Sequence, residues 1–170
     1  GDFIRQSSIN ELAQFEGQEI AESDVKLLSP ITRNQQFLCQ GANYRQHMIE
    51  SGMDPDAKTF NMIFRKASSC IVPADSDVIK PDNVRFLDYE IELGLVMKRE
   101  IKAPVTVTDN NLHDYIAGIV IVNDYSARDV QIPQMQFYKG KSFRTFGPVG
   151  PYLCLLCPSS ILYLKELQLL

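Results

Sequence analysis

The sequence has little that would suit a nucleic-acid-binding, membrane-spanning or secreted protein. Lysine and arginine number 17 against 21 aspartates and glutamates, and a net charge of -4 provides no basic surface of the kind that binds nucleic acid. No apolar run approaches the roughly 20 residues that cross a bilayer, and the N-terminus has no charged head before an apolar core. We therefore expect a protein of the cytoplasm, or of mitochondria in a eukaryote, without nucleic-acid or membrane partners.

Cysteine is also sparse. Of the four cysteines, only Cys154 and Cys157 have a suggestive spacing, within PYLCLLCPSS. A single CxxC among leucines, without a second pair or a nearby histidine, is a weak signal for zinc or redox chemistry. We interpret both as strand cysteines.

The composition is that of a globular protein, with 45% hydrophobic and 22% charged residues over 170 positions. This length is enough for one main domain with a sizeable core. A short helix capped by Ser8 and ended by Gly17 indicates a small N-terminal segment, residues 1–26, before a main domain of residues 27–170. Because strand patterns outnumber helical ones, we predict a mainly β fold with short helices, of the α+β class.

Four segments give the clearest predictions of local structure. Residues 87–97, LDYEIELGLVM, alternate like one half-buried strand, and Ile119–Val122 predicts a strand buried on both faces. The stretch NYRQHMIESG predicts a helix up to Gly52, and Thr108–Asn110 predicts another helix start. The strand over 87–97 matters most, because it carries two glutamates.

Glu90 and Glu92 would project from the same face of that strand, with Cα atoms about 6 to 7 Å apart. On a solvent-facing strand, such a pair needs no function. Asp124, however, comes where a buried strand ends, and three carboxylates around one point repel each other unless a cation neutralises them. All-oxygen ligation suits Mg²⁺ or Mn²⁺, with Ca²⁺ as a further option, better than zinc.

Three motifs in order, LDYEIELGLVM, IVIVNDYSARDVQ and GKSFRTFGPVGPYL, resemble the paired glutamates, NDxSARDxQ and GKSF of the fumarylacetoacetate hydrolase family. Upstream, QGANYRQHMIE and IFRKASSCIVP are similar to the family's GxNYxxHxxE and Phe-x-Lys segments. The resemblance runs from about Leu27 to Leu153. It implies the mixed β-sheet roll or barrel of the family's C-terminal domain, a small 2-oxo acid as substrate, and a homodimer.

The same resemblance implies a divalent metal held by Glu90, Glu92 and Asp124, with Lys141 of GKSF pointing into the site. A cation beside an enolate would stabilise its developing negative charge. Without the motif, Lys141 would be interpreted as an ordinary loop lysine.

Further site residues follow from the resemblance. His47 and Glu50 match the dyad with which relatives activate water, and their spacing of three places them on one face of a helical turn. Gln131 falls where the family has a substrate-facing glutamine, and Tyr44 and Arg45 are further substrate contacts. Without the motif, His47 would be interpreted as a surface histidine.

Other polar residues near the motifs are assigned no chemistry. Arg128 and Asp129 are expected to pair with each other or with neighbours and so fix the loop, and His113 is expected to be structural. Residues 43–58 would form a lid that becomes ordered with ligand and excludes water during the reaction.

The chain departs from the family pattern in two places. The family's Phe-Leu-Lys-Pro run reads Phe64, Arg65, Lys66 and Ala67 here, and the strands and Thr-Gly-Thr-Pro loop that follow GKSF in relatives are missing. We therefore expect a truncated chain or one that lacks segments, with residues 158–170 as the remnant of a later strand. A shortened barrel would expose strand edges and apolar faces.

The predicted reaction is Mg²⁺- or Mn²⁺-dependent hydrolysis of a C–C bond in an acylpyruvate-type 2-oxo acid through a metal-held enolate. His47, oriented by Glu50, would activate water, and Lys141 would stabilise the leaving enolate. Decarboxylation of oxaloacetate-like acids and isomerisation of hydroxymuconate-type diacids use the same constellation and stay open. A catalytically silent metal-binding relative is the remaining alternative, and the intact dyad argues against it.

Overall fold

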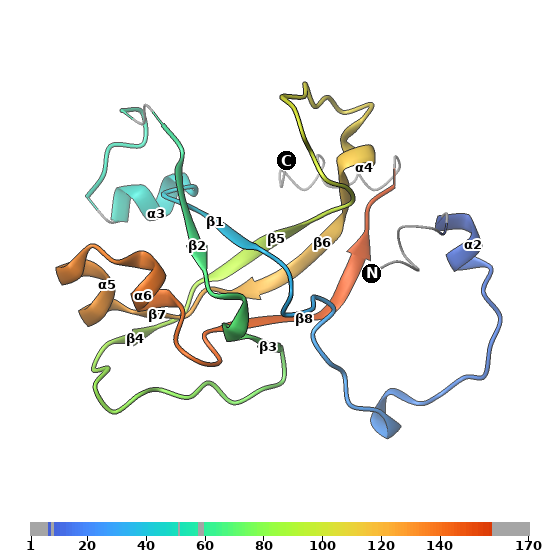
Figure 1. Ribbon diagram of the computed structural model, residues 1–170, viewed down its shortest axis with the longest axis horizontal. Helices are drawn as coiled ribbons and strands as arrows, with labels where there is room; N and C mark the ends of the chain where they lie inside the picture. Colours follow the sequence, from blue (N-terminus) through green and yellow to red (C-terminus); the bar gives the residue numbers. More distant parts are fainter. Residues whose placement is uncertain (1–6, 8, 51, 58–59, 158–170) are drawn as a thin grey trace.

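Three open sheets and a few short helices form the computed structural model, which describes residues 7, 9–50, 52–57 and 60–157 (Figure 1). The elements, in chain order, are α2 (Ile9–Ala13), η1 (Glu22–Asp24), β1 (Phe37–Gly41), α3 (Arg45–Glu50), β2 (Met62–Lys66), η2 (Ser68–Cys70), β3 (Ile71–Pro73), β4 (Leu87–Asp88), β5 (Ile91–Met97), α4 (Leu112–Tyr115), β6 (Ile116–Asn123), β7 (Ser126–Ala127), α5 (Arg128–Gln134), α6 (Phe137–Lys141) and β8 (Gly147–Leu155). This architecture confirms the prediction of a mainly β fold with short helices.

The largest sheet is mixed and has the strand order β3-β8-β6-β5. β3 runs parallel to β8, whereas β6 is antiparallel to both β8 and β5. The buried side chains of its inner face are Ile71, Val120, Val122 and Val149. Because β-branched side chains pack well on a pleated surface, this face holds the main core of the described chain.

β1 and β2 form a separate antiparallel hairpin. The connection between the two strands, residues 42–61, is long and carries α3 near its start. Phe37 of β1 packs against the main core, and the ring of Phe64 in β2 meets that of Phe137 in α6 edge to face, with 5.5 Å between centroids. The hairpin therefore links the main sheet to the helices.

α5 and α6 pack closely against each other. A Cβ atom at Gly140 of α6 would lie 2.6 Å from the Cβ atom of Gln131 in α5, so this approach requires glycine. Val130 of α5 belongs to a second core with Val84 and Phe146. The helices are thereby fixed beside the end of β6, where the charged residues of the candidate site gather.

The single strand predicted over residues 87–97 is wrong, because the segment pairs with two different sheets. β4 pairs with β7, β5 pairs with β6, and two residues connect them. The backbone N–H of Glu90 donates to Asn123 Oδ1 at 3.1 Å, and its carbonyl accepts from the N–H of Asp124 at 2.7 Å. Glu90 therefore lies in the connection between β4 and β5, alongside the end of β6, whereas Glu92 lies within β5.

The prediction that Ile119–Val122 is buried on both faces is also wrong. Val120 and Val122 are buried, but Ile121 between them is 53% exposed. On the neighbouring β5, Ile91 is 62% exposed. The outer face of these strands is thus apolar and open in the described chain, in agreement with the expected exposure of apolar faces.

The helices agree with the sequence only in part. α3 confirms the helix predicted before Gly52, and α4 begins at Leu112, just after the predicted start at Thr108–Asn110. α5 and α6 were not predicted, since Pro133 lies inside the first and the second has only 5 residues. No helix of the described part of the chain is long and apolar enough to cross a bilayer.

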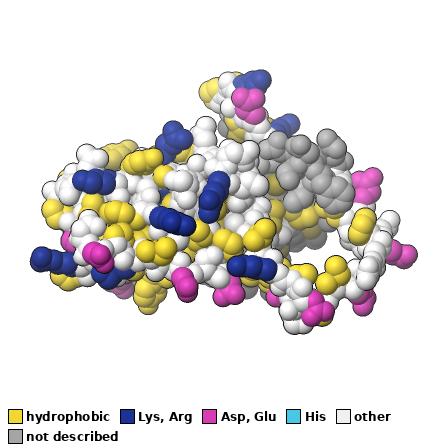
Figure 2. Space-filling view, turned by 60° about the horizontal axis from the view of Figure 1, so that its bottom comes forward, with side chains coloured by type: hydrophobic (Ala, Val, Ile, Leu, Met, Phe, Trp, Pro, Cys, Tyr) yellow, Lys and Arg dark blue, Asp and Glu magenta, His cyan; other side chains and the backbone are white. Residues whose placement is uncertain are grey.

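The N-terminal region is the most extended part of the molecule. α2 ends at Ala13 rather than at Gly17. After α2 the chain forms an arch that carries Asp and Glu side chains and stands away from the body (Figure 2). Ser8, the predicted cap, and residues 158–170, the predicted remnant of a strand, lie outside the described residues. The division after residue 26 stays a prediction.

Candidate active site

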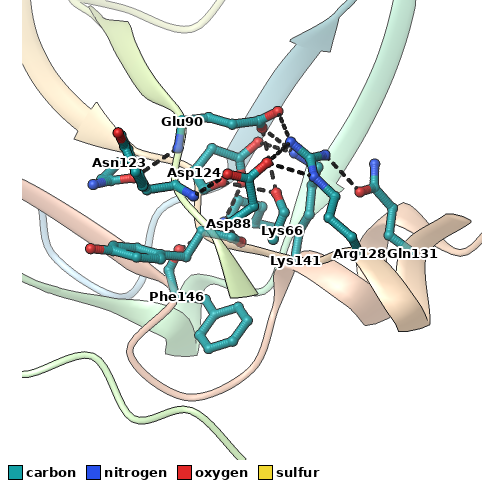
Figure 3. A network of polar contacts seen from close by, with 12 residues as sticks. Lys66, Asp88, Glu90, Asn123, Asp124, Arg128, Gln131, Lys141 and Phe146 are labelled. Carbon is teal, nitrogen blue, oxygen red and sulfur yellow. Dashed lines mark hydrogen bonds and ion pairs between the residues drawn. The ribbon is translucent and has the colours of Figure 1, made fainter. Parts of the chain in front are cut away.

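Asp124 directly follows β6 and is the centre of a buried group of charges (Figure 3). Its side chain is 6% exposed, Oδ1 accepts a hydrogen bond from Lys66 Nζ, and Oδ2 accepts one from Lys141 Nζ at 2.7 Å. The two lysine side chains are 0% and 4% exposed. Since buried charges are stable only when they are paired, these three groups form one unit. We call Lys66, Asp124 and Lys141, together with Glu90, Glu92 and Arg128, the charge cluster.

Lys66 was not predicted as a site residue. From the end of β2, its Nζ also donates to the carbonyl oxygens of Phe146, at 2.8 Å, and Tyr125, at 3.2 Å. All three ammonium protons therefore have acceptors. The IFRK segment could have pointed to this lysine as a site residue. Its partner Asp124, however, lies 58 residues further along the chain.

The Glu90 carboxylate lies between two cations. Oε2 accepts from Lys141 Nζ, and Oε1 accepts from Arg128 Nη2 at 2.6 Å. Burial alone would raise the pKa of Glu90, but the hydrogen bonds and charges of Lys141 and Arg128 outweigh it and lower the pKa to about 2. Glu90 is therefore ionised, and Lys141 bridges the carboxylates of Glu90 and Asp124.

Glu92 points from β5 toward the same cluster and is half-buried. Burial raises its pKa, the hydrogen bond from the Tyr44 hydroxyl opposes this, and the nearby carboxylates of Glu90 and Asp124 raise the pKa again. The three predicted metal ligands are thus within electrostatic reach of one another. The Tyr44 hydrogen bond also ties the start of α3 to β5.

Arg128, which was assigned no chemistry, holds several side chains together. Its Nε and Nη2 donate to Asp88 Oδ2 at 2.9 and 2.7 Å, Nη2 also donates to Glu90, and Nη1 donates to Gln131 Oε1 at 2.8 Å. Of the two expected alternatives, pairing with neighbours is the one found, and pairing with Asp129 is not, because Asp129 accepts from two backbone N–H groups just before β4. The fold brings in Asp88, the main partner of Arg128, from 40 residues upstream.

α3 presents the predicted dyad to solvent rather than to the cluster. His47 and Glu50 are exposed, and Glu50 Oε1 accepts from Gln46 Nε2 at 2.9 Å. Within the described chain, no hydrogen bond or ion pair joins His47 to Glu50. Arg45 forms a two-pronged ion pair with Asp56, at 2.7 and 2.9 Å, on the surface. The catalytic and substrate roles of His47, Glu50 and Arg45 therefore stay predictions.

The donor chemistry of the cluster fits a hard divalent cation. Glu90, Glu92 and Asp124 offer only carboxylate oxygens, and the repulsion that raises the pKa of Glu92 is one that a cation would relieve. In the described residues, no three His, Cys, Asp or Glu side chains are close enough to hold a metal ion. Lys141 Nζ lies between two of the carboxylates and would have to yield space to a bound cation.

Comparison with known proteins gives a family. The sequence-family model described as "Fumarylacetoacetate (FAA) hydrolase C-terminal" matches residues 36–169. "Oxaloacetate tautomerase YisK" of Bacillus subtilis is 38% identical over 134 residues, which are 77% of this chain and 43% of that protein. "Oxaloacetate tautomerase Fahd2a, mitochondrial" of Rattus norvegicus is 36% identical over 135 residues, 79% of this chain and 42% of the relative. The chain thus spans less than half the length of these two relatives.

Solved structures agree with this result. The 5-carboxymethyl-2-hydroxymuconate delta-isomerase from Mycobacterium smegmatis is similar with a TM-score of 0.70 and 30% identity, over 86% of this chain and 56% of that chain. The structure of Cg1458 with inhibitor is similar with a TM-score of 0.72 and 27% identity, over 85% and 52%. The sequence match, the shared fold and the ordered motifs around the cluster together show that this chain belongs to the fumarylacetoacetate hydrolase C-terminal domain family.

Proposed function

We propose that the charge cluster is the active site of an enzyme acting on enolisable 2-oxo acids, with keto–enol tautomerisation of oxaloacetate as the first candidate reaction. The observation that carries this proposal is Lys141, an ammonium buried between the carboxylates of Glu90 and Asp124. In such a site, a cation stabilises an oxyanion more strongly than it would in water. The names of relatives, an oxaloacetate tautomerase and a hydroxymuconate isomerase, support this substrate class.

Tautomerisation moves one proton. The C–H bond at C3 of the oxo acid breaks, its electron pair forms the C2–C3 double bond, and the oxygen on C2 gains a proton. Lys141 would donate a hydrogen bond to that oxygen as negative charge develops. His47 is the proposed base for the C3 proton, and it would have to approach the cluster with the α3 segment.

Glu90, Glu92 and Asp124 are the proposed holders of Mg²⁺ or Mn²⁺. When bound, such a cation polarises the oxo group and acidifies the neighbouring C–H bond. Lys66 donates to one carboxylate oxygen of Asp124 and Lys141 to the other, and Tyr44 orients Glu92 through its hydroxyl. These contacts would keep the carboxylates in place as ligands exchange.

The experiment follows the ultraviolet absorbance of enol-oxaloacetate, with Mg²⁺, in wild type, Lys141→Met and Lys139→Met. Lys139 lies in the same helix, but it is exposed and donates to Gln134. We expect kcat/KM of Lys141→Met to fall by about 10² or more and Lys139→Met to behave like wild type. Absence of catalysis in wild type, or equal activity in all three proteins, would contradict the proposal.

Hydrolysis of an acylpyruvate C–C bond is the second candidate, favoured by the presence of His47 and Glu50 one turn apart on α3. Water would lose a proton to His47 and attack the distal carbonyl, after which the C–C bond breaks and the pyruvate enolate gains a proton. His47→Ala should then lower kcat by about 10² to 10⁴ with unchanged Mg²⁺ affinity. Full activity of this variant would rule out the base.

A panel of acylpyruvates, oxaloacetate and hydroxymuconate-type diacids separates the remaining reactions. Decarboxylation releases carbon dioxide, isomerisation shifts a double bond, and hydrolysis yields pyruvate and a second acid. A catalytically silent relative would turn over none of them. The homodimer, expected from the family, is tested in the same samples by light scattering.

A further inference from the structure

The strands β4 and β5 keep one register although they pair with different strands. β4 ends opposite Ser126, and β5 begins opposite Asn123. Two residues lie between these positions on each side, so Glu90 falls opposite Asp124. Residues opposite each other in an antiparallel pair project from the same face, which places both carboxylates on one side of the backbone.

Only half of the regular backbone pair is formed between Glu90 and Asp124. The N–H of Asp124 donates to the carbonyl of Glu90 at 2.7 Å, and in a regular antiparallel pair the N–H of Glu90 would donate back to the carbonyl of Asp124. It donates instead to Asn123 Oδ1 at 3.1 Å. The carbonyl of Asp124 accepts from the Ser126 hydroxyl at 3.0 Å. The side chain of Asn123 thus replaces a backbone acceptor of the ladder.

This replacement occurs where the two carboxylates converge. Lys141 Nζ donates to Glu90 Oε2 and to Asp124 Oδ2, and Figure 3 shows the contact of Asn123 with the Glu90 backbone beside this bridge. Because Asn123 supplies the acceptor, the carbonyl of Asp124 can turn to Ser126 without leaving the Glu90 N–H unpaired. The backbone of Glu90 is therefore held by one hydrogen bond from Asp124 and one to Asn123.

We infer that Asn123 is a positioning residue that fixes the Glu90 backbone relative to Asp124 and thereby sets the spacing of their two carboxylates. The cation that these carboxylates would hold rests on the proposed function, whereas the position of Glu90 does not. Mg²⁺ demands near-ideal octahedral geometry, and Ca²⁺ accepts a more flexible arrangement of oxygens. Loss of the Asn123 contact should therefore weaken Mg²⁺ binding more than Ca²⁺ binding.

The position of Glu90 is tested by amide hydrogen exchange, followed for single residues by nuclear magnetic resonance of the metal-free full chain. Asn123→Leu removes the acceptor and should speed exchange of the Glu90 amide by about tenfold, while Asn123→Asp keeps an oxygen acceptor and should leave exchange slow. The matched control is Asn111→Leu, because Asn111 Oδ1 also accepts from a backbone N–H, that of Thr108 at 2.7 Å, outside the charge cluster. An unprotected Glu90 amide in wild type, or equal exchange in wild type and Asn123→Leu, would overturn the inference.

The spacing of the carboxylates is tested by calorimetric titration of Mg²⁺ and of Ca²⁺ into the same proteins. Asn123→Leu should weaken Mg²⁺ binding by about tenfold and Ca²⁺ binding by less, whereas Asn123→Asp and Asn111→Leu should keep the wild-type ratio of the two affinities. Equal losses for both cations in Asn123→Leu would indicate a general disturbance of the site and would contradict a positioning role. Absence of Mg²⁺ binding in wild type would contradict the proposed cation site, while the exchange experiment still decides on Asn123.

Discussion

The charge cluster and the α3 segment differ in how far their ion pairs are exposed to solvent. Lys66 and Asp124 in the cluster are 0% and 6% exposed, whereas Arg45 and Asp56 beside α3 are 64% and 73% exposed. Breaking the first pair leaves a buried charge without a partner and costs several kcal/mol. Breaking the second costs little, because water can solvate both charges. The ion pairs of the cluster are therefore costly to break, whereas the ion pair between Arg45 and Asp56 can be broken at little cost.

We expect the two regions to contribute to different steps, the charge cluster to ligand binding and α3 to turnover. The groups proposed to bind a cation and an oxyanion lie near one another, on β5, just before β5, on α6 and just after β6. The predicted acid–base residues, His47 and Glu50, lie on a helix tied to β5 through Tyr44. Substitutions in the cluster should thus affect folding and binding, and substitutions in α3 should affect catalysis.

The largest expected effect is that of Lys66→Met on stability. Loss of the ammonium leaves Asp124 with one cationic partner and removes the lysine donor of the buried Phe146 carbonyl and the partly buried Tyr125 carbonyl. The free energy of unfolding should therefore fall by about 3 to 5 kcal/mol. Urea denaturation measures this change. Arg45→Ala, which breaks the exposed ion pair, is the control and should leave the urea midpoint nearly unchanged. Similar midpoints for the two variants would remove the contrast between the regions.

A second expected effect concerns pH. The folded-state pKa of Glu90, about 2, lies below its ordinary value of 4.5, so the ionised carboxylate stabilises the fold above pH 4.5. This contribution should be lost progressively as the pH falls from about 5 toward 2. Urea denaturation of wild type and Glu90→Gln in metal-free buffer measures it, and the two stability curves should converge toward acid.

The control for the pH experiment is Glu100→Gln, which removes an exposed carboxylate paired with Lys102. Its stability curve should run parallel to that of wild type over the same pH range. A constant gap between wild type and Glu90→Gln down to pH 2 would contradict the cationic environment of Glu90.

A smaller effect, on dynamics, is expected in α3. Oxalate with Mg²⁺ should slow amide hydrogen exchange in residues 45–50, because water must be excluded during the reaction, and should change exchange in β6 little. Mass spectrometry of exchanged peptides measures both segments in one experiment. Equal exchange in α3 with and without ligand would count against the predicted lid.

Local sequence patterns predicted the mainly β fold and the α3 helix, and family-like motifs located Glu90, Glu92, Asp124 and Lys141. They did not predict the strand break at Glu90, because the change of pairing partner is decided by β6 and β7 and not by the alternating residues themselves. The prediction that Ile119–Val122 is buried on both faces failed for a related reason, since Ile121 is exposed. An apolar run does not say which of its faces the rest of the fold covers.

Lys66 and Asp88 show a further limit of sequence reasoning. Their roles arise from hydrogen bonds to Asp124 and Arg128, which lie 58 and 40 residues further along the chain. Arg128 lay inside a family-like motif, but the motif did not say which neighbours it would contact. Contacts between distant segments are set by tertiary structure, so the positioning residues emerge only with the fold.

Calorimetric titration of Mg²⁺ into wild type and Glu92→Ala, with Glu100→Ala as control, tests most directly whether the charge cluster is a divalent-cation site. Removal of Glu92 leaves too few anionic oxygens to offset the dehydration of a hard cation, whereas Glu100 is a surface residue outside the cluster. We expect saturable Mg²⁺ binding in wild type and Glu100→Ala and no measurable binding in Glu92→Ala. Equal Mg²⁺ affinity in wild type and Glu92→Ala would contradict the proposed site.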